Sequence, residues 1–516
     1  MTPARGPLTA GLPAGFTVRL SPELHRADHG RLLVGGSPLT ALRITDAASE
    51  LLAGGTLTVT DPAAQRLARR LLDANLAYPD LAGLDRASPA DLTVVIPARD
   101  RADQLDRTLA ALRPLRCIVV DDASVEPRAV AAVAGRHSAE LVALTRNLGP
   151  AGARNAGLAS VTTPLVAFVD SDVTVASDAL LGLTRHLADP AVALVGPRVR
   201  GKSRATRPRW FERYDELASS LDRGTMPASV RPFGKVAYLP SACLVGRTAD
   251  LVLDGDHPAP ATRRPLRPRP ARTTPGSAHA DTPPWRGDGF DPTLRVGEDV
   301  DLVWRLVARG RTVRYDPGLR AEHDTRGTLR AWLGRTYVYG TSSAELAARH
   351  RSNVAPAVLT PAYAVCAATL LGRTRWSVPA GVVGIAIGAR AIRRGLPRAP
   401  APLTTRLAVS GLTSAVRQEA ALVLRHGWPL IFVAAPASRL VRRAILSAVV
   451  VDTFAAFHEH RPSSFRDALV VTVGRRLDDA AYGAGLWAGA GSARSWACLL
   501  PLRQKSTGSH LPKNMR

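Results

Sequence analysis

The sequence has few cysteines and few aromatic residues, and each shortage argues against a class of protein. Its 516 residues include only four cysteines, which lie far apart and form no CxxC pair. Neither a cysteine-based zinc site nor a disulfide framework is indicated, and we expect a reducing compartment. Aromatic residues make up 5% of the chain. Because nucleic-acid surfaces interleave basic residues with aromatic ones, we expect no nucleic-acid partner.

The N-terminal stretch also lacks something, namely the apolar core of a secretory signal. We therefore expect the catalytic part of the chain to stay in the cytoplasm. The charge is strongly one-sided, with 68 Lys and Arg against 43 Asp and Glu and a formal net charge of +25. Such an excess suits anionic partners, such as a nucleotide or an acidic membrane surface. A compositional bias is the alternative, because Arg is scattered along the whole chain.

Changes in composition divide the chain into four regions, since its length exceeds that of one ordinary domain. We predict a small α+β module over residues 1–90 and an α/β domain over 91–348. An apolar helical region punctuated by Arg follows over 349–490, and a disordered tail over 491–516. A Pro- and Arg-rich segment, 254–289, is predicted to be a disordered insertion within the α/β domain.

The N-terminal module carries a strand pattern and two helical patterns. We predict the strand over Phe16–Leu20 and the helices over Leu39–Leu52 and Asp61–Asn75. Asp61 is a suitable N-cap because Pro62 follows at the first helical position.

Short apolar strands alternate with helical patterns over residues 91–250. The predicted strands are Thr93–Ile96, Ile118–Val120, Leu141–Leu144 and Leu165–Val169, and the predicted helices are Ala102–Leu112, Arg128–Arg136 and Pro150–Ala159. This alternation indicates a mostly parallel sheet covered on both faces. Ligands of such sheets gather at the carboxyl ends of the strands, so polar groups at those positions are candidate site residues.

The region after residue 353 contains uncharged apolar runs, of which Val354–Leu371 is the longest. Clusters of Arg separate these runs. A spanning helix needs roughly 20 apolar residues, and only this first run approaches that length. Two interpretations stay open. One is membrane attachment, by a spanning hairpin or by helices lying in the interface with Arg on anionic head groups. The other is an Ala-rich soluble helical domain.

Polar residues follow the first two predicted strands of the α/β domain. Pro97 and Asp100 come after the first strand, and Asp121 and Asp122 come after the second. Carboxylates at this position can accept hydrogen bonds from the base or ribose of a nucleotide. The alternative is that one of the aspartates caps the following helix.

The stretch Arg146–Gly157 is rich in small residues and opens a helix. Small residues let backbone approach a ligand closely, and a helix N-terminus favours anions. Arg146 or Arg154 could neutralise a diphosphate there. Close packing of the helix on the sheet through Gly and Ala is the alternative.

Two carboxylates flank one serine at the end of the fourth strand, in Asp170-Ser171-Asp172. Hard divalent cations prefer oxygen ligands and bridge phosphates, so this pair is a candidate for holding a cation on a nucleotide-sugar. His323 could coordinate the same cation, although a single histidine is equally well explained as a packing residue.

A helix with three acids in its first turn is predicted after Gly297. Acids at that end favour the helix dipole. The functional interpretation makes Asp299 a general base that takes a proton from an acceptor.

Six motifs together resemble a known family. In order they are VVIPARDR, VVDDAS, NLGPAGARNAG, FVDSDV, LPSACLVGR and FDPTLRVGEDVDLVWRL, and they cover residues 91–345. They resemble the family 2 inverting glycosyltransferases, which have the GT-A fold. The resemblance implies one displacement at the anomeric carbon, with inversion. It also implies donor-side roles: Asp100, Asp121 and Asp122 bind base and ribose, Asp170 contacts ribose, and Asp172 holds Mg²⁺ or Mn²⁺ on the diphosphate.

On the acceptor side, the resemblance places Ser241 and Ala242 in the strand that faces the acceptor. Asp299 is at the position of the catalytic base, with Glu298 beside it touching the acceptor. Trp304, on the same helix, is our third acceptor-side candidate.

A narrower resemblance is to the mycofactocin-biosynthesis glycosyltransferases. It rests on LLVGGSPLTALRIT before the core, on HDTRGTLRAWLGRTYVYGTSSAELAARH after it, and on the Arg-punctuated apolar C-terminal region. It implies UDP-glucose as donor and the peptide-derived redox cofactor mycofactocin as acceptor. A cell-envelope lipid or polysaccharide is the alternative acceptor. The order of helices and strands over residues 16–85 is also similar to the PqqD-like peptide-binding modules.

Two further absences narrow the reaction. No QxxRW motif follows Glu298-Asp299, so we expect addition of one or a few sugars rather than extrusion of a polymer. No Gly-rich loop with a basic residue follows Ile96, which argues against a sugar nucleotidyltransferase.

Overall fold

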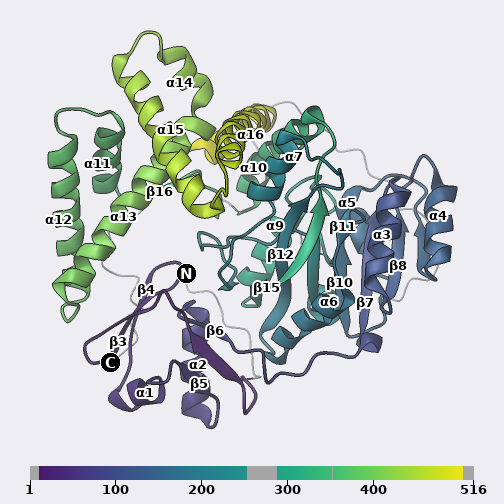
Figure 1. Ribbon diagram of the computed structural model, residues 1–516. Helices are drawn as coiled ribbons and strands as arrows, with labels where there is room; N and C mark the ends of the chain where they lie inside the picture. Colours follow the sequence, from purple (N-terminus) through teal and green to yellow (C-terminus); the bar gives the residue numbers. More distant parts are fainter. Residues whose placement is uncertain (1–10, 253–286, 351–352, 504–516) are drawn as a thin grey trace.

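The computed structural model describes residues 11–252, 287–350 and 353–503, so nearly all of the predicted insertion lies outside the described residues. A central sheet with its covering helices forms one part (Figure 1). An N-terminal module and a group of C-terminal helices lie beside it. The module and the helices also contact each other, because Ala27, Leu32 and Val34 pack against Ala399, just before helix α13 (Ala401–Ala421).

The central sheet is nine-stranded, in the order β11-β15-β12-β14-β10-β7-β8-β9, with β13 paired to β15. Its strands are β7 Leu92–Ala98, β8 Arg116–Asp121, β9 Glu140–Ala143, β10 Leu165–Val169, β11 Val173–Thr174, β12 Val192–Lys202, β13 Ala228–Ser229, β14 Cys243–Arg247 and β15 Thr312–Asp324. The half from β10 to β9 is parallel, as predicted. β14 runs antiparallel to both of its neighbours, so the whole sheet is mixed.

Helices cover both faces of this sheet. They are α3 Ala102–Leu112, α4 Pro127–Arg136, α5 Gly149–Leu158, α6 Ser177–Leu183, α7 Trp210–Ala218, α8 Thr248–Leu251 and α9 Glu298–Ala308. On one face α3, α4 and α6 pack against β7 and β10, and on the other α5 and α9 pack against the opposite side chains of the same strands. The continuous apolar pattern of β7 and β10 is explained by this double burial. The predicted strands and helices of residues 91–250 are confirmed to within a few residues at their ends.

The N-terminal module contains two three-stranded sheets, β5-β1-β6 and β2-β3-β4. Its elements are β1 Thr17–Leu20, β2 His25–Ala27, β3 Leu32–Gly35, β4 Thr40–Arg43, α1 Asp46–Leu51, β5 Thr56–Thr58, α2 Pro62–Asp73 and β6 Ala77–Pro79. The helix predicted from Asp61 is confirmed, because the Asp61 carboxylate accepts from the backbone N–H groups of Ala63 and Ala64 at 2.7 and 3.0 Å.

The helix predicted over Leu39–Leu52 is wrong in its first half. Residues Thr40–Arg43 form β4, which pairs with β3 and so satisfies its backbone in a sheet. The helix begins only after Thr45, whose hydroxyl accepts from the Ala48 N–H at 3.2 Å. An apolar residue every third or fourth position fitted a helix, but strand pairing determined the outcome.

The C-terminal helices are α10 Leu329–His350, α11 Pro361–Leu371, α12 Ser377–Gly395, α13 Ala401–Ala421, α14 Trp428–Ala434, α15 Arg439–His460 and α16 Phe465–Ser492. Within the described residues no helix is both long and apolar enough to span a membrane.

Residues 491–503 were predicted as part of a disordered tail, and this is wrong. α16 continues to Ser492, a 3₁₀ turn covers Ala497–Leu499, and β17 (Leu502–Arg503) pairs with β16 (Val358–Leu359). Burial of Cys498 against α10 and α16 fixes the segment. The remainder of the tail lies outside the described residues.

Glycines allow α10 and α16 to pack backbone against backbone. A Cβ added at Gly485 of α16 would lie 1.9 Å from the carbonyl oxygen of Tyr337, and one at Gly340 of α10 would lie 2.2 Å from that of Tyr482. No side chain fits at either position. The close contact holds α10 in place along its middle turns.

We predict that Gly485→Ala lowers the free energy of unfolding by about 1–3 kcal/mol, since the added methyl group forces the helices apart. Gly491→Ala is the matched control on the same helix, because nothing lies within 4 Å of its Cβ position. That variant should leave stability unchanged or raise it by up to about 1 kcal/mol. Urea unfolding of both variants measures the difference, and equal effects would contradict the close packing.

Candidate active site

The loops after β7 and β8 are locked together at the carboxyl edge of the sheet. The Asp100 N–H donates to Ser124 Oγ at 2.7 Å, and the Asp100 carboxylate accepts from the Val125 N–H at 2.8 Å. Pro97, half-buried at the end of β7, pairs in register with Val120 of β8. The two loops predicted to bind the nucleotide, after β7 and β8, therefore lie side by side and form one surface, which we call the wall.

Asp122 holds the start of α5. Its two carboxylate oxygens accept from the N–H groups of Leu148 and Gly149 at 2.6 and 2.9 Å. Burial raises the pKa of Asp122, while these two hydrogen bonds lower it. Asp121 instead accepts from the Ser124 N–H at 3.0 Å. The alternative interpretation was that one of these aspartates caps the following helix. The structure shows a cap of this kind, but Asp122 caps α5 rather than α4, the helix that follows it directly.

Arg154 lies at the centre of the site and is 2% exposed. Its guanidinium donates to Asp170 Oδ1 at 2.5 Å and to Glu298 Oε1 at 2.9 Å. The same group lies over the ring of Phe290, 5.2 Å from its centroid. One buried cation therefore connects the Asp170-Ser171-Asp172 loop to the first turn of α9.

The candidate base is held from two sides. Asp299 Oδ2 accepts from the Ser241 N–H at 3.2 Å, and Asp299 Oδ1 accepts from the Val300 N–H at 2.8 Å. The carbonyl of Ala242, the next residue along, accepts from the Asp170 N–H at 3.0 Å. The short segment before β14 thus contacts both Asp299 and Asp170 and brings them near each other.

Burial sets the protonation of this acidic pair. Burial raises the pKa of Asp299, and it raises the pKa of Glu298 to about 7, with the Asp299 charge adding to the effect and Arg154 opposing it. Two carboxyl groups this close do not both ionise easily. One of them can therefore hold or accept a proton near neutral pH.

Asp172 and His323 face each other beside a pocket that His323 lines. His323 Nε2 lies 3.6 Å from Asp172 Oδ1, and both side chains are 7% exposed. The Nδ1 atom of His323 is buried without a hydrogen-bond partner among the described residues. Although burial alone raises the pKa of Asp172, His323, Arg326 and Arg101 lower it to about 2.

A divalent cation fits here if the substrate supplies further ligands. No group of three His, Cys, Asp or Glu residues in the described part of the chain could hold a metal ion alone. Mg²⁺ and Mn²⁺ bound to nucleotides typically take one or two protein ligands and complete their shell with phosphate oxygens and water. Asp172 and His323 match that pattern.

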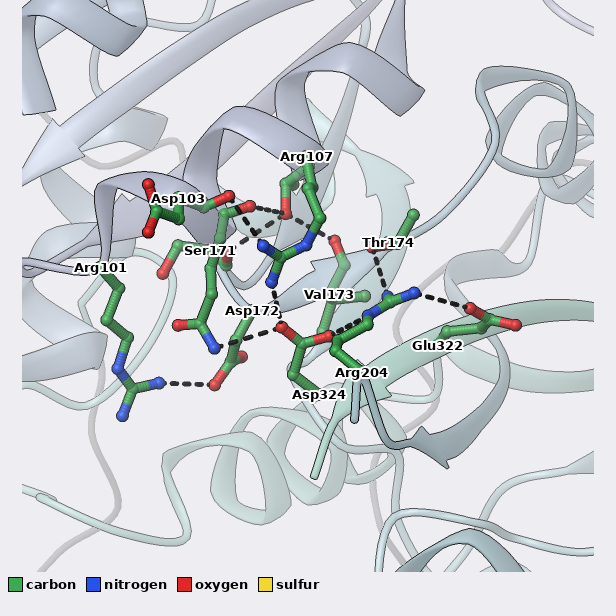
Figure 2. A network of polar contacts seen from close by, with 12 residues as sticks. Arg101, Asp103, Arg107, Ser171, Asp172, Val173, Thr174, Arg204, Glu322 and Asp324 are labelled. Carbon is green, nitrogen blue, oxygen red and sulfur yellow. Dashed lines mark hydrogen bonds and ion pairs between the residues drawn. The ribbon is translucent and has the colours of Figure 1, made fainter. Parts of the chain in front are cut away.

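A polar network fixes the loop that carries Asp172 (Figure 2). Asp324 accepts from Arg107 at 2.6 Å and from Arg204 at 2.7 Å, and its N–H donates to the Asp172 carbonyl at 2.9 Å. The Thr108 hydroxyl lies 3.1 and 2.9 Å from the carbonyls of Ser171 and Val173. The end of β15 and α3 together therefore hold Asp172 in place.

Comparison with known proteins agrees with this geometry. Residues 93–249 match the family described as Glycosyl transferase family 2. The chain is 39% identical to the pre-mycofactocin glycosyltransferase of Mycobacterium tuberculosis over 498 residues, which cover 95% of this chain and 98% of that protein. The chain belongs to glycosyltransferase family 2.

More distant proteins match shorter parts. The succinoglycan biosynthesis protein ExoO of Rhizobium meliloti is 40% identical over 112 residues, which are 20% of this chain and 32% of that one. A mannosyltransferase from Pyrobaculum calidifontis, solved in complex with GDP-Man and Mn2+, superposes with a TM-score of 0.37 and 19% identity over 78% of this chain and 90% of that chain. The family resemblance and fold class predicted from the six motifs are confirmed, and the protein is a glycosyltransferase.

Two predicted site residues do not join the cleft. Trp304 is buried in the core behind α9, where its indole N–H donates to the Ala237 carbonyl at 2.8 Å and its ring meets His350 edge to face. This packing leaves it no face for an acceptor, so the structure contradicts the acceptor-side prediction for Trp304. Arg146 is exposed on the loop before α5, and its donor-side role stays a prediction.

Sequence reasoning missed the basic side of the cleft. Arg101 lies 2.7 Å and Arg326 3.3 Å from Asp172, and Arg335 donates to the Tyr339 hydroxyl at 2.7 Å. Arg326 and Arg335 line one pocket together with His323, Trp332 and Tyr339. Five residues that line this pocket stand in the motif that begins with His323, so that motif was the available signal: Arg326, Trp332, Arg335, Thr336 and Tyr339. Because arginines are scattered along the whole chain, those in this motif did not stand out in the sequence.

We predict that Arg154→Met lowers the free energy of unfolding by about 3–5 kcal/mol, because it leaves two buried carboxylates without their counter-charge. Arg146→Met, on the exposed loop nearby, is the control and should stay within about 0.5 kcal/mol of the wild type. Urea unfolding at pH 8 measures both. If the two variants lose the same free energy of unfolding, the buried guanidinium group of Arg154 is not what holds α5, β10 and α9 together.

Proposed function

We propose that this glycosyltransferase moves glucose from UDP-glucose to a hydroxyl group of a peptide-derived redox cofactor of the mycofactocin type, with inversion at the anomeric carbon. The acceptor is supported by the 39% identity to the pre-mycofactocin glycosyltransferase over nearly the whole of both chains. The reaction is supported by one observation above all. Arg154 joins Asp170 to Glu298 by direct hydrogen bonds, and Asp299 follows Glu298 in the chain and accepts from the Ser241 N–H.

The donor nucleoside would lie against the wall formed by Pro97, Asp100 and the Asp121-Asp122 pair. Asp170, at the end of β10, is placed to accept from the ribose. Its carboxylate is 22% exposed and retains an oxygen that Arg154 does not use. Arg146 stands on the loop beside this wall and could reach the phosphates.

Asp172 and His323 would hold Mg²⁺ or Mn²⁺ on the diphosphate. When bound, such a cation offsets the charge that grows on the leaving diphosphate. The protein's own contribution has two parts: Asp324 and Thr108 hold the backbone of the Asp172 loop, and His323, Arg326 and Arg101 lower the pKa of Asp172 to about 2 and so keep it ionised.

The chemistry at the other end is proton removal by Asp299. The acceptor oxygen attacks the anomeric carbon as its proton passes to Asp299, and the bond to the diphosphate oxygen breaks with both electrons leaving on the diphosphate. The Ser241 N–H positions the base by donating to Asp299, and the neighbouring Ala242 carbonyl accepts from the Asp170 N–H. Glu298, whose burial raises its pKa to about 7, can donate to or accept from an acceptor hydroxyl.

We predict that Asp299→Asn lowers kcat by about 10²–10⁴-fold while the affinity for UDP-glucose changes less than about threefold. In the wild type, kcat should fall as the pH drops through the raised pKa of the acidic pair, because the base must be ionised to accept a proton. Glu50→Gln, on the exposed surface of the N-terminal module, is the control. Product formation by mass spectrometry gives kcat. An Asp299→Asn enzyme with wild-type turnover would place the base elsewhere.

We also propose a cytoplasmic location at the inner face of the membrane, through one end of the C-terminal helices. Six large apolar side chains there are more than half exposed: Trp376, Val378, Leu430, Phe432, Val433 and Leu440. The turn after α11 meets the start of α15, since a Cβ on Gly372 would lie 2.8 Å from Leu440 Cδ1. The apolar tip so defined is flanked by Arg373, Arg375, Arg439, Arg442 and Arg443.

Exposed apolar side chains next to arginines fit a surface of anionic lipids, in which the apolar groups enter the interface and the guanidinium groups meet the head groups. This placement also suits the alternative function, transfer to a cell-envelope lipid or polysaccharide. An assay of the purified enzyme with both acceptor classes decides between the two.

We predict that the enzyme sediments with vesicles of 30% phosphatidylglycerol in phosphatidylcholine and not with phosphatidylcholine alone. Replacing both Phe432 and Val433 by Ser should weaken this binding by about tenfold or more, since two buried apolar side chains are lost. Leu51→Ser removes an exposed apolar side chain from the N-terminal module and is the control, which should bind like the wild type. Unchanged binding by the Phe432 and Val433 double variant would refute the role of the apolar tip.

A further inference from the structure

Guanidinium groups from separate elements gather around Asp172. Arg101 comes from the start of α3, Arg326 from the loop after β15, and Arg335 from α10. Arg101 and Arg326 are ion-paired with Asp172 at 2.7 and 3.3 Å (Figure 2 shows the Arg101 contact). Although burial alone lowers the pKa of Arg335, Tyr339 and the charge of Asp172 raise it.

Too few carboxylates face this cluster to neutralise it. Asp170 is engaged by Arg154, and Asp324 is engaged by Arg107 and Arg204. Asp215 lines the pocket beside Arg326 and Arg335, but burial raises its pKa and so favours its neutral form.

Asp478 also lines that pocket, where it accepts from the Thr336 hydroxyl at 3.2 Å and lies 3.4 Å from Arg425. Among the described residues, Arg101 and Arg326 therefore share the single carboxylate of Asp172 as their ion-pair partner, and Arg335 is held only by its hydrogen bond to Tyr339 and the nearby charges of Asp172 and Asp170. The cleft keeps an excess of positive charge beside the candidate cation site.

We propose that Arg101, Arg326 and Arg335 form a binding site for the donor diphosphate. In the free enzyme Asp172 holds two of these guanidinium groups in place. When the nucleotide-sugar enters, the guanidinium groups exchange Asp172 for phosphate oxygens, with which they form charge-assisted hydrogen bonds. Asp172 is then released to face the divalent cation. This inference rests on the proposed function and extends it to residues that no motif had assigned.

The arrangement has a consequence for the order of binding. A cation that approaches the free enzyme meets several positive groups and few protein ligands, so it should bind weakly alone. The diphosphate supplies both the counter-charge and the missing ligands. Nucleotide should therefore bind measurably without metal, and metal should bind well only with nucleotide.

The first test measures UDP and GDP binding by calorimetry in the presence of EDTA and then of Mn²⁺. We expect Arg326→Gln and Arg335→Gln each to weaken metal-free binding by about tenfold or more, which is the effect of losing one charged hydrogen bond. Arg330→Gln is the control, because Arg330 is an exposed residue on α10 outside the pocket. Its affinity should stay within about twofold of the wild type. Metal-free affinity that is the same in all three variants as in the wild type would overturn the inference.

The second test uses Asp172→Asn and predicts effects of opposite sign. The change removes the anion that competes for the guanidinium groups, so metal-free nucleotide binding should strengthen by about threefold or more. The same change should abolish the gain in affinity that Mn²⁺ produces. If the diphosphate is held by the cation alone, metal-free binding will instead stay unchanged or weaken, and this result overturns the inference.

Different results would refute the donor class and the arginine site. If the wild type binds no nucleoside diphosphate even with Mn²⁺, the proposed donor class is wrong and the arginine site falls with it. If the wild type binds nucleotide but Arg326→Gln and Arg335→Gln bind it equally well, only the arginine site is refuted.

Discussion

A buried guanidinium group is the constraint on which the site depends. Arg154 is almost inaccessible to water, and a charge in that position is tolerated only when counter-charges and hydrogen bonds surround it. Asp170 and Glu298 provide them, from the end of β10 and the start of α9. Three elements far apart in the sequence must therefore meet at one point. Asp299 follows Glu298 directly and is brought to the same cleft without needing a contact to Arg154 of its own.

The C-terminal helices contribute to the site through α10. That helix carries Trp332, Arg335 and Tyr339 to the edge of the cleft, and its position is fixed by glycine-mediated contact with α16. α16 is itself bound to the catalytic domain, because Arg213 of α7 pairs with Asp467 at 2.9 Å. A region that reads as a possible membrane attachment is thus also a structural wall of the active site. The two roles are compatible, since the residues of the apolar tip lie on α14 and near the contact between α11 and α15, and none of them lines the pocket at the site.

The sequence predicted those features that depend on residues close together in the chain, and it failed for those that depend on contacts between distant residues. The strand and helix alternation of residues 91–250 follows from periodicity alone, and Asp61 and Pro62 mark the start of α2 correctly. The Leu39–Leu52 segment failed because pairing with β3, a non-local contact, overrode a helical pattern. Trp304 failed for a similar reason: the motif placed it on the right helix, but only the packing of α9 on the sheet decides which face it occupies. The contact between Ser241 and Asp299 joins residues 58 positions apart and has no local signature at all.

The arginines show the same limit from the side of charge. A net charge of +25 spread over 516 residues looks like compositional bias. The structure divides these residues by environment: Arg154 is neutralised inside the core, Arg101 and Arg326 are half-neutralised by Asp172, and the arginines beside the apolar tip face solvent. Only the second group combines proximity to a candidate cation site with incomplete neutralisation. Positive charge indicates a binding site where the fold brings several basic side chains together without enough carboxylates to neutralise them. Neither condition can be inferred from the amino-acid composition.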